Sequence, residues 1–158
     1  MLGTTTTSTL PNLVLIAEDD SDDRLIMMEA WKDHPLGRET HFVEDGAELL
    51  EYLFHVGRYP DPATSPRPGL ILLDLNMPNK NGHQVLAEIQ AHSVLKNIPV
   101  VIMTSSMAAN DMTRSHELGA AIFLHKPVSL SGYQSTFQTL HNYMVENFVS
   151  HSEGGGHV

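Results

Sequence analysis

Five short apolar runs alternate with longer amphipathic segments, and this alternation limits the fold more than any other feature of the chain. Runs of four or five residues rich in branched side chains predict strands, whereas apolar residues spaced three or four apart predict helices. The predicted strands cover Leu13–Ala17, Thr40–Val43, Leu70–Leu73, Val100–Met103 and Ala121–Leu124. Repeated βα units give a parallel sheet, because each helix returns the chain to the end of the sheet where the previous strand began. We therefore expect an α/β fold.

Five βα units in succession are typical of a doubly wound, flavodoxin-like sheet with strand order 2-1-3-4-5 and helices on both faces. The expected domain covers residues 12–149, which is long enough to bury one hydrophobic core. The Thr- and Ser-rich residues 1–11 and the polar residues 150–158 predict disordered tails.

Capping residues and helix breakers set the expected helices. The first begins at Asp20 or Ser21, ends at Pro35–Gly37 and carries the apolar residues Leu25, Ile26, Met28 and Trp31. The others cover Gly46–His55, a segment with Val85, Leu86 and Ile89, Ala108–Leu118 and Ser131–Phe148.

The segment Gly57–Gly69 contains four prolines and predicts a non-helical connection. This connection is long for such a fold. A neutral surface insertion is favoured over a functional loop.

Composition excludes several classes of function. The chain has no Cys, which rules out disulfides, thiolate metal sites and Cys nucleophiles. Nine basic against nineteen acidic residues give a formal charge of −10, which disfavours nucleic-acid binding. No apolar run approaches the roughly 20 residues that a membrane span needs, and the first residues lack the pattern of a signal peptide. We expect a cytoplasmic protein that binds neither nucleic acid nor membrane.

Polar side chains follow four of the five predicted strands. Asp74 ends the third run and opens a loop rich in Pro, Gly and Asn, although a strand can also stop at Asp for reasons of turn geometry. The other strand ends favour a site: Glu18-Asp19-Asp20 follow the first, Thr104-Ser105-Ser106 the fourth and Lys126-Pro127 the fifth. In a doubly wound sheet these ends surround the ligand crevice.

The strand order places Glu18 and Asp19 opposite Asp74. Carboxylates this close repel one another unless a cation is present, and an all-oxygen cluster suits Mg²⁺. We expect Asp19, Asp74 and the backbone carbonyl of Asn76 to bind the ion, with Glu18 acting mainly through water.

A metal-bound carboxylate can attack phosphorus, and Asp74 is the candidate nucleophile. The Lys126 ammonium and the Thr104 hydroxyl can then compensate charge on the phosphoryl oxygens. The small Ser105 would leave room for the phosphoryl group. Pro127 would stiffen the loop that holds Lys126, and we expect a cis bond between these two residues.

Taken together in this order, the motifs resemble the signature of bacterial two-component receiver domains. The resemblance rests on the acidic residues Glu18-Asp19-Asp20, the run Asp74-Leu75-Asn76-Met77-Pro78 with Gly82, Thr104-Ser105 and Lys126-Pro127, and it covers about Leu13 to Phe148. It implies a response regulator whose Asp74 accepts a phosphoryl group from a sensor histidine kinase. Thr104 and Phe123 match the family's switch positions. The resemblance implies no enzyme activity beyond slow loss of the phosphoryl group.

The residues after the fifth helix are too few for an output domain, so we expect the protein to act by binding other proteins. The helix Ser131–Phe148 is rich in aromatics and poor in charge, which favours a homodimer. The segments Leu49–Gly57 and Asn97–Ser106 are similar to those of single-domain regulators paired with bacterial and cyanobacterial phytochromes. This implies a light-sensing kinase as partner, and onward transfer to a histidine phosphotransfer protein is equally allowed.

Three alternatives remain at this point. A flavin carrier would need a glycine- and hydroxyl-rich loop where Glu18-Asp19-Asp20 stand. A haloacid-type phosphatase would need a second acid where Asn76 stands. A phosphorylation-independent interaction module stays open, although no expected site residue is missing.

Overall fold

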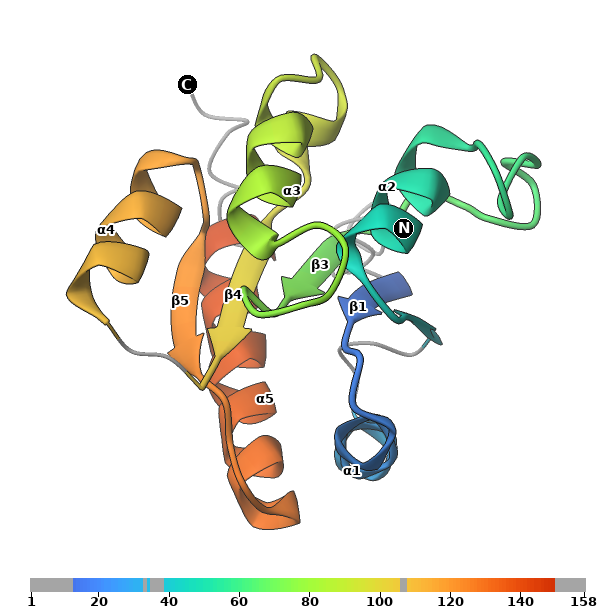
Figure 1. The fold of residues 1–158 in the computed structure, drawn as a ribbon. Helices are drawn as coiled ribbons and strands as arrows, with labels where there is room; N and C mark the ends of the chain where they lie inside the picture. Colours follow the sequence, from blue (N-terminus) through green and yellow to red (C-terminus); the bar gives the residue numbers. More distant parts are fainter. Residues whose placement is uncertain (1–12, 33, 35–38, 106–107, 150–158) are drawn as a thin grey trace, which may run out of the picture.

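The computed structural model describes residues 13–32, 34, 39–105 and 108–149. Its centre is a sheet of five parallel strands in the order β2-β1-β3-β4-β5 (Figure 1). The strands are β1 Leu13–Ala17, β2 Glu39–Val43, β3 Leu70–Leu73, β4 Val100–Thr104 and β5 Ile122–His125. The predicted fold class and strand order are confirmed.

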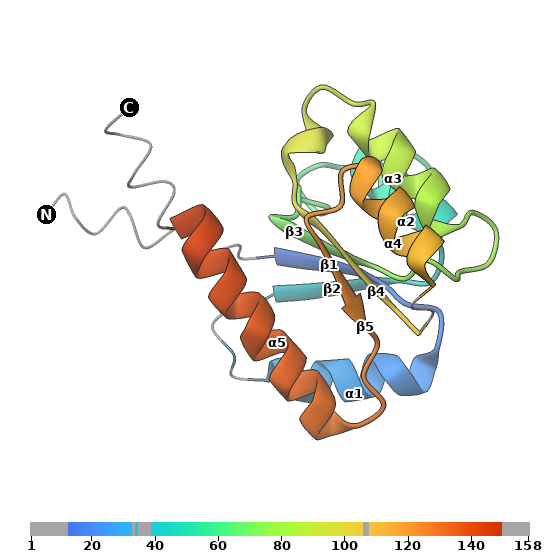
Figure 2. The same ribbon diagram turned by 90° about the vertical axis from the view of Figure 1, so that its left-hand side faces the viewer.

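Helices cover both faces of the sheet, with α1 and α5 on one face and α2, α3 and α4 on the other (Figure 2). Their bounds are α1 Ser21–Trp31, α2 Gly46–Phe54, α3 Gly82–Gln90, α4 Ala109–Glu117 and α5 Leu130–Met144, with short helices η2 Leu95–Asn97 and η3 Val145–Val149. Side chains cap four N-termini, because each capping oxygen accepts from a free backbone N–H of the first turn. The caps are Asp20, Asp45, Asn81 and Ser129.

Each face of the sheet has its own apolar core. On the α1/α5 face, the indole of Trp31 stacks on Phe137 with ring centroids 3.8 Å apart. The apolar stripe of α5 is buried in this core: Tyr133, Phe137, Leu140 and Met144. These four side chains face the sheet and are not available to a second protomer. The side chain of Phe148 lies outside the described part.

The buried face of helix α1 differs from the predicted one. Met27 and Ala30 are buried beside Trp31, whereas Leu25 is 64% exposed and Met28 is 54% exposed. The positions of the apolar residues in the sequence predicted the wrong buried face of α1, because they do not show which side of the helix packs against α5.

The connection Gly57–Gly69 is anchored along α2. The Tyr52 hydroxyl donates to the carbonyl of Pro66 at 2.8 Å, and the ring of His55 lies 2.8 Å from the carbonyl of Ser65. His55 adopts a left-handed conformation, with φ of 57°, and ends α2. The connection is therefore packed against the domain, and its functional neutrality stays a prediction.

The two predicted tails and the predicted helix end at Pro35–Gly37 lie outside the described residues, as does Ser106. Across the described segments, no helix has both the length and the apolar character that a membrane crossing requires.

Candidate functional site

The carboxyl ends of the parallel strands lie at one end of the sheet (Figure 1), and the predicted site residues follow or end four of these strands. Glu18 follows β1, Asp74 follows β3, Thr104 ends β4 and Lys126 follows β5. Glu18 and Thr104 are almost fully buried, and Asp74 is 7% exposed. Their burial at the strand ends restricts the positions that these side chains can take.

The loop after β3 fixes the Asp74 carboxylate. One oxygen, Oδ1, accepts from the backbone N–H of Asn76 at 3.0 Å. The Asn76 side chain in turn donates to the Thr104 hydroxyl at 3.3 Å. The backbone N–H of Gly82 closes the loop on the carbonyl of Leu75 at 3.0 Å. These bonds leave Asp74 Oδ2 directed toward Lys126.

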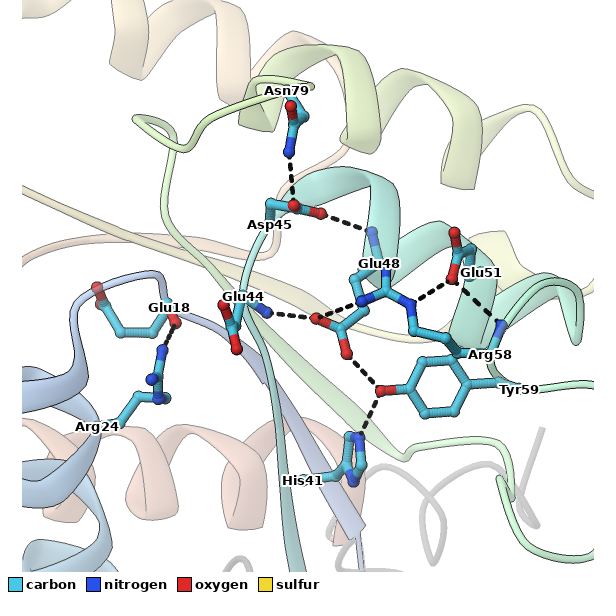
Figure 3. Close-up of polar contacts among 10 residues, drawn as sticks. All are labelled: Glu18, Arg24, His41, Glu44, Asp45, Glu48, Glu51, Arg58, Tyr59 and Asn79. Carbon is cyan, nitrogen blue, oxygen red and sulfur yellow. Dashed lines mark hydrogen bonds and ion pairs between the residues drawn. The ribbon is translucent and has the colours of Figure 1, made fainter.

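Glu18 is anchored from the backbone and from α1. Its carbonyl accepts from the Arg24 guanidinium at 2.8 Å (Figure 3). Its carboxylate accepts from the backbone N–H of Asp20 at 3.1 Å. Burial raises the pKa of the Glu18 carboxyl, and the hydrogen bond from Lys126 opposes this rise only in part.

Lys126 lies among three carboxylates. Its Nζ is 2.9 Å from Glu18 Oε1, 2.9 Å from Asp23 Oδ2 and 3.2 Å from Asp74 Oδ2. Burial alone would lower the pKa of Lys126, but the hydrogen bonds to Glu18 and Asp23 outweigh it and raise that pKa. The ammonium therefore stays charged and neutralises part of the acidic cluster.

The peptide bond between Lys126 and Pro127 is trans, so the prediction of a cis bond is wrong. The backbone N–H of Lys126 donates to the carbonyl of Thr104 at 2.8 Å, which continues the β4–β5 pairing to this residue. The trans form is the commoner state of such a bond by about 0.5–1 kcal/mol.

The acidic residues fit a divalent cation. Oxygens of Glu18, Asp19 and Asp74 all lie within 4.8 Å of one another, two of the residues being buried and Asp19 exposed. Oxygen ligands with a solvent-facing side suit Mg²⁺, which keeps several waters. The residues present therefore agree with the expected ion.

The remaining predicted residues lie around this centre. Ser105 is exposed directly after Thr104. Phe123 is half-buried in β5 and packs against the core on the α2/α3/α4 face, beside Ile102 of β4.

Sequence reasoning missed Asp23, the third carboxylate on Lys126. It lies five residues after Glu18, in the first turn of α1. Acidic residues in a first turn also stabilise the helix dipole, so the run Asp19–Asp23 does not reveal which carboxylate turns to the site.

A second polar network, also missed, lies beside the site (Figure 3). The Tyr59 hydroxyl donates to Glu48, a buried residue of α2, and lies 3.3 Å from the ring nitrogen Nε2 of His41. The α2 cap, Asp45, accepts from the Asn79 side chain at 2.6 Å. The network thus connects the proline-rich connection to the loop that follows Asp74.

A family model described as the response regulator receiver domain matches residues 14–137. The response regulator Rcp1 of Synechocystis sp. is 36% identical over 136 residues, which are 86% of this chain and 90% of the relative.

Solved structures agree with this match. The phosphorylated cyanobacterial phytochrome response regulator RcpA superposes with a TM-score of 0.76 at 34% identity, over 88% of this chain and 94% of that one. The Mn²⁺-bound form of Rcp1 superposes with a TM-score of 0.73 at 36% identity, over 87% and 93% of the two chains.

Proposed function

This chain belongs to the response regulator receiver domain family, and from that premise we propose that it is a phosphoacceptor whose Asp74 takes a phosphoryl group from a histidine kinase. The observation that carries the proposal is that an ammonium and a hydroxyl lie beside Asp74. Lys126 Nζ is 3.2 Å from the Asp74 carboxylate, and the Asn76 side chain connects the loop after Asp74 to the Thr104 hydroxyl. Phosphoryl transfer needs mainly positioning and charge compensation, and these groups supply both.

The transfer step is a displacement at phosphorus. A carboxylate oxygen of Asp74 forms the new P–O bond while the P–N bond to the donor imidazole breaks, and the imidazole leaves with the bond's electron pair and takes up a proton. The Lys126 ammonium and the Thr104 hydroxyl donate to the phosphoryl oxygens. Ser105, small and exposed, leaves the approach open.

Glu18, Asp19 and Asp74 would hold a divalent cation, with the Asn76 carbonyl as a further ligand. When bound, this cation supplies positive charge to the phosphoryl oxygens and relieves the repulsion among the carboxylates. The similarity to Rcp1, which was solved with Mn²⁺ bound, supports a divalent ion here, and we assign Mg²⁺.

The partners follow from the relatives and from the chemistry. A sensor histidine kinase is the phosphoryl donor, and the similarity to a cyanobacterial phytochrome response regulator supports a phytochrome in that role. A histidine phosphotransfer protein presents the same imidazole chemistry and is a second acceptor. The regulator acts in the cytoplasm, where it signals by protein–protein contact rather than by catalysis, with slow loss of its own phosphoryl group.

Activation would change the surface beside β5. A phosphoryl group adds nearly two negative charges, which draw Thr104 inward, and the half-buried Phe123 then moves into the vacated space. A homodimer would form on such a changed surface, because the buried stripe of α5 cannot supply the interface.

Intact mass after incubation with acetyl phosphate tests the proposal. Wild-type protein with Mg²⁺ should gain one phosphoryl group, whereas protein in EDTA and the Asp74→Asn variant should gain none. Size-exclusion elution of the same samples would show whether a dimer follows phosphorylation. No mass gain from acetyl phosphate or from a phosphorylated histidine kinase would favour the alternative, a phosphorylation-independent interaction module.

A further inference from the structure

The Lys126 ammonium has no hydrogen-bond donor to spare in this structure. An ammonium carries three N–H donors, and Nζ has three carboxylate partners at 2.9, 2.9 and 3.2 Å. An arriving phosphoryl oxygen can accept from Lys126 only if one of these contacts is given up. Which contact breaks decides how the resting state differs from the phosphorylated state.

Asp23 differs from the other two partners. Glu18 and Asp74 belong to the group of carboxylates that can hold a cation, and Asp23 is not in that group. Its pair with Lys126 therefore does not have to change when a cation binds. Asp23 is also nearer to Nζ than Asp74 is, by 2.9 Å against 3.2 Å, and its side chain is more exposed, at 27% against 8%.

The first turn of α1 fixes the position of Asp23. The backbone N–H of Asp23 donates to the capping Asp20, which fixes the first turn of α1 beside the strand ends. The side chain of Lys126, at the start of the connection between β5 and α5, reaches this first turn through its ion pair with Asp23. Asp23 thus engages one donor of the ammonium on the α1 side, while another donor contacts Asp74.

We propose that Asp23 is a positioning residue that retains Lys126 in the resting state and releases it when a phosphoryl group reaches Asp74. This inference rests on the proposed function and adds a determinant of its rate. The pair with Asp23 stabilises only the unphosphorylated protein. Loss of the pair should speed phosphoryl uptake and leave phosphoryl loss unchanged, because Lys126 has already left Asp23 in the phosphorylated state.

The chain offers a matched control one residue away. Asp22 and Asp23 share the first turn of α1, so their removal changes the helix dipole and the net charge alike. The backbone N–H groups of both donate to Asp20. Among the ion pairs of Lys126, only the one from Asp23 involves this turn.

Rates of uptake and loss, measured by intact mass, test the inference. Wild type, Asp23→Ala, Asp23→Glu and Asp22→Ala are mixed with varied acetyl phosphate and Mg²⁺; a P–O bond to Asp74 forms as the P–O bond to acetate breaks, and acetate leaves. Asp23→Ala should raise the maximal uptake rate about threefold, because this is the rate change that corresponds to the free energy of a partly exposed ion pair. Asp23→Glu should restore the wild-type rate, and Asp22→Ala should change at most the KM for the anionic donor.

Loss of the phosphoryl group, followed after removal of the donor, should be equal in all four proteins. An unchanged maximal uptake rate in Asp23→Ala, or an equal gain in Asp22→Ala, would overturn the inference and leave the proposed function standing. A wild type that takes up no phosphoryl group would overturn both. If Asp23→Ala lowers the thermal midpoint, Asp23→Asn replaces it, and the same comparison with Asp22→Asn decides.

Discussion

At the scale of single residues, the site is a balance between one ammonium and several carboxylates. Glu18, Asp23 and Asp74 all contact Lys126, and Asp19 adds a further negative charge nearby. One positive charge cannot neutralise this group, which is why a cation has an electrostatic reason to bind. Asp74, the proposed phosphoryl acceptor, is therefore held by Lys126 inside a group of side chains whose summed charge is negative.

Gly82 packs closely against the loop that follows β3, so its replacement should displace the backbone of Asp74 and Leu75. A Cβ there would lie 2.7 Å from the Cα of Leu75 and 2.9 Å from the carbonyl oxygen of Asp74, so the loop after β3 would have to shift. We expect Gly82→Ala to lower the free energy of unfolding by about 2 kcal/mol. Urea denaturation measures this as a lower midpoint.

Gly132→Ala is the control for that substitution. The two atoms nearest to its Cβ would be side-chain atoms, Pro127 Cβ at 3.1 Å and Ser129 Oγ at 3.2 Å, and Ala favours the helix by up to about 1 kcal/mol. Gly132→Ala should therefore stay within about 1 kcal/mol of wild type. If Gly82→Ala were as stable as wild type, the close approach to Asp74 would not constrain the loop.

At the scale of elements, the connection between α2 and β3 is held by a titratable group. His41 of β2 lies between the rings of Tyr52 and Tyr59, with centroids 5.0 and 5.6 Å away, and faces the Glu48 carboxylate through Tyr59. Because the Tyr59 hydroxyl donates to Glu48, Nε2 of His41 donates to Tyr59. Burial lowers the pKa of His41, and the charge of Glu48 opposes this only in part.

The lowered pKa of His41 sets the sign of a pH dependence. Below the ordinary value of 6.5, the unfolded chain takes up a proton that the folded protein resists. The contribution of His41 to stability is therefore complete above that pH and is lost as the pH falls toward the folded pKa. Urea denaturation at a series of pH values should show wild type losing stability relative to His41→Phe over this window.

His41→Gln separates titration from the hydrogen bond. Gln keeps a donor for Tyr59 and does not titrate, so it should show the flatter pH dependence of His41→Phe while keeping more stability at neutral pH. Parallel curves for wild type and both variants would show that His41 does not contribute to the pH dependence.

The sequence predicted elements better than it predicted how they meet. Strand ends at Asp74, Thr104 and Lys126 were identified correctly because a parallel sheet aligns its carboxyl ends whatever the loops do. Asp23 and the His41–Tyr59–Glu48 network were missed because they depend on the rotation of a helix and on the path of a long connection. Neither leaves a periodic signal, and the exposure of Leu25 has the same cause.

At the scale of the whole molecule, the dominant property is the formal charge of −10. Like charges repel more in the compact state than in the unfolded chain, so screening should stabilise the fold. Raising NaCl from about 10 mM to about 150 mM shortens the Debye length from about 30 Å to about 8 Å. We expect the thermal midpoint in EDTA to rise by about a few degrees over this range.

A large cation that cannot enter the acidic cluster separates screening from specific ion binding. Tetramethylammonium chloride at equal ionic strength should give the same rise, because screening depends on charge and not on ion size. The buried contacts of Lys126 should be screened little, so they do not offset the effect. A midpoint that falls with salt would mean that surface ion pairs such as Arg58–Glu51 contribute more than the net repulsion costs. A rise with NaCl alone would assign the effect to Na⁺ held by the acidic cluster.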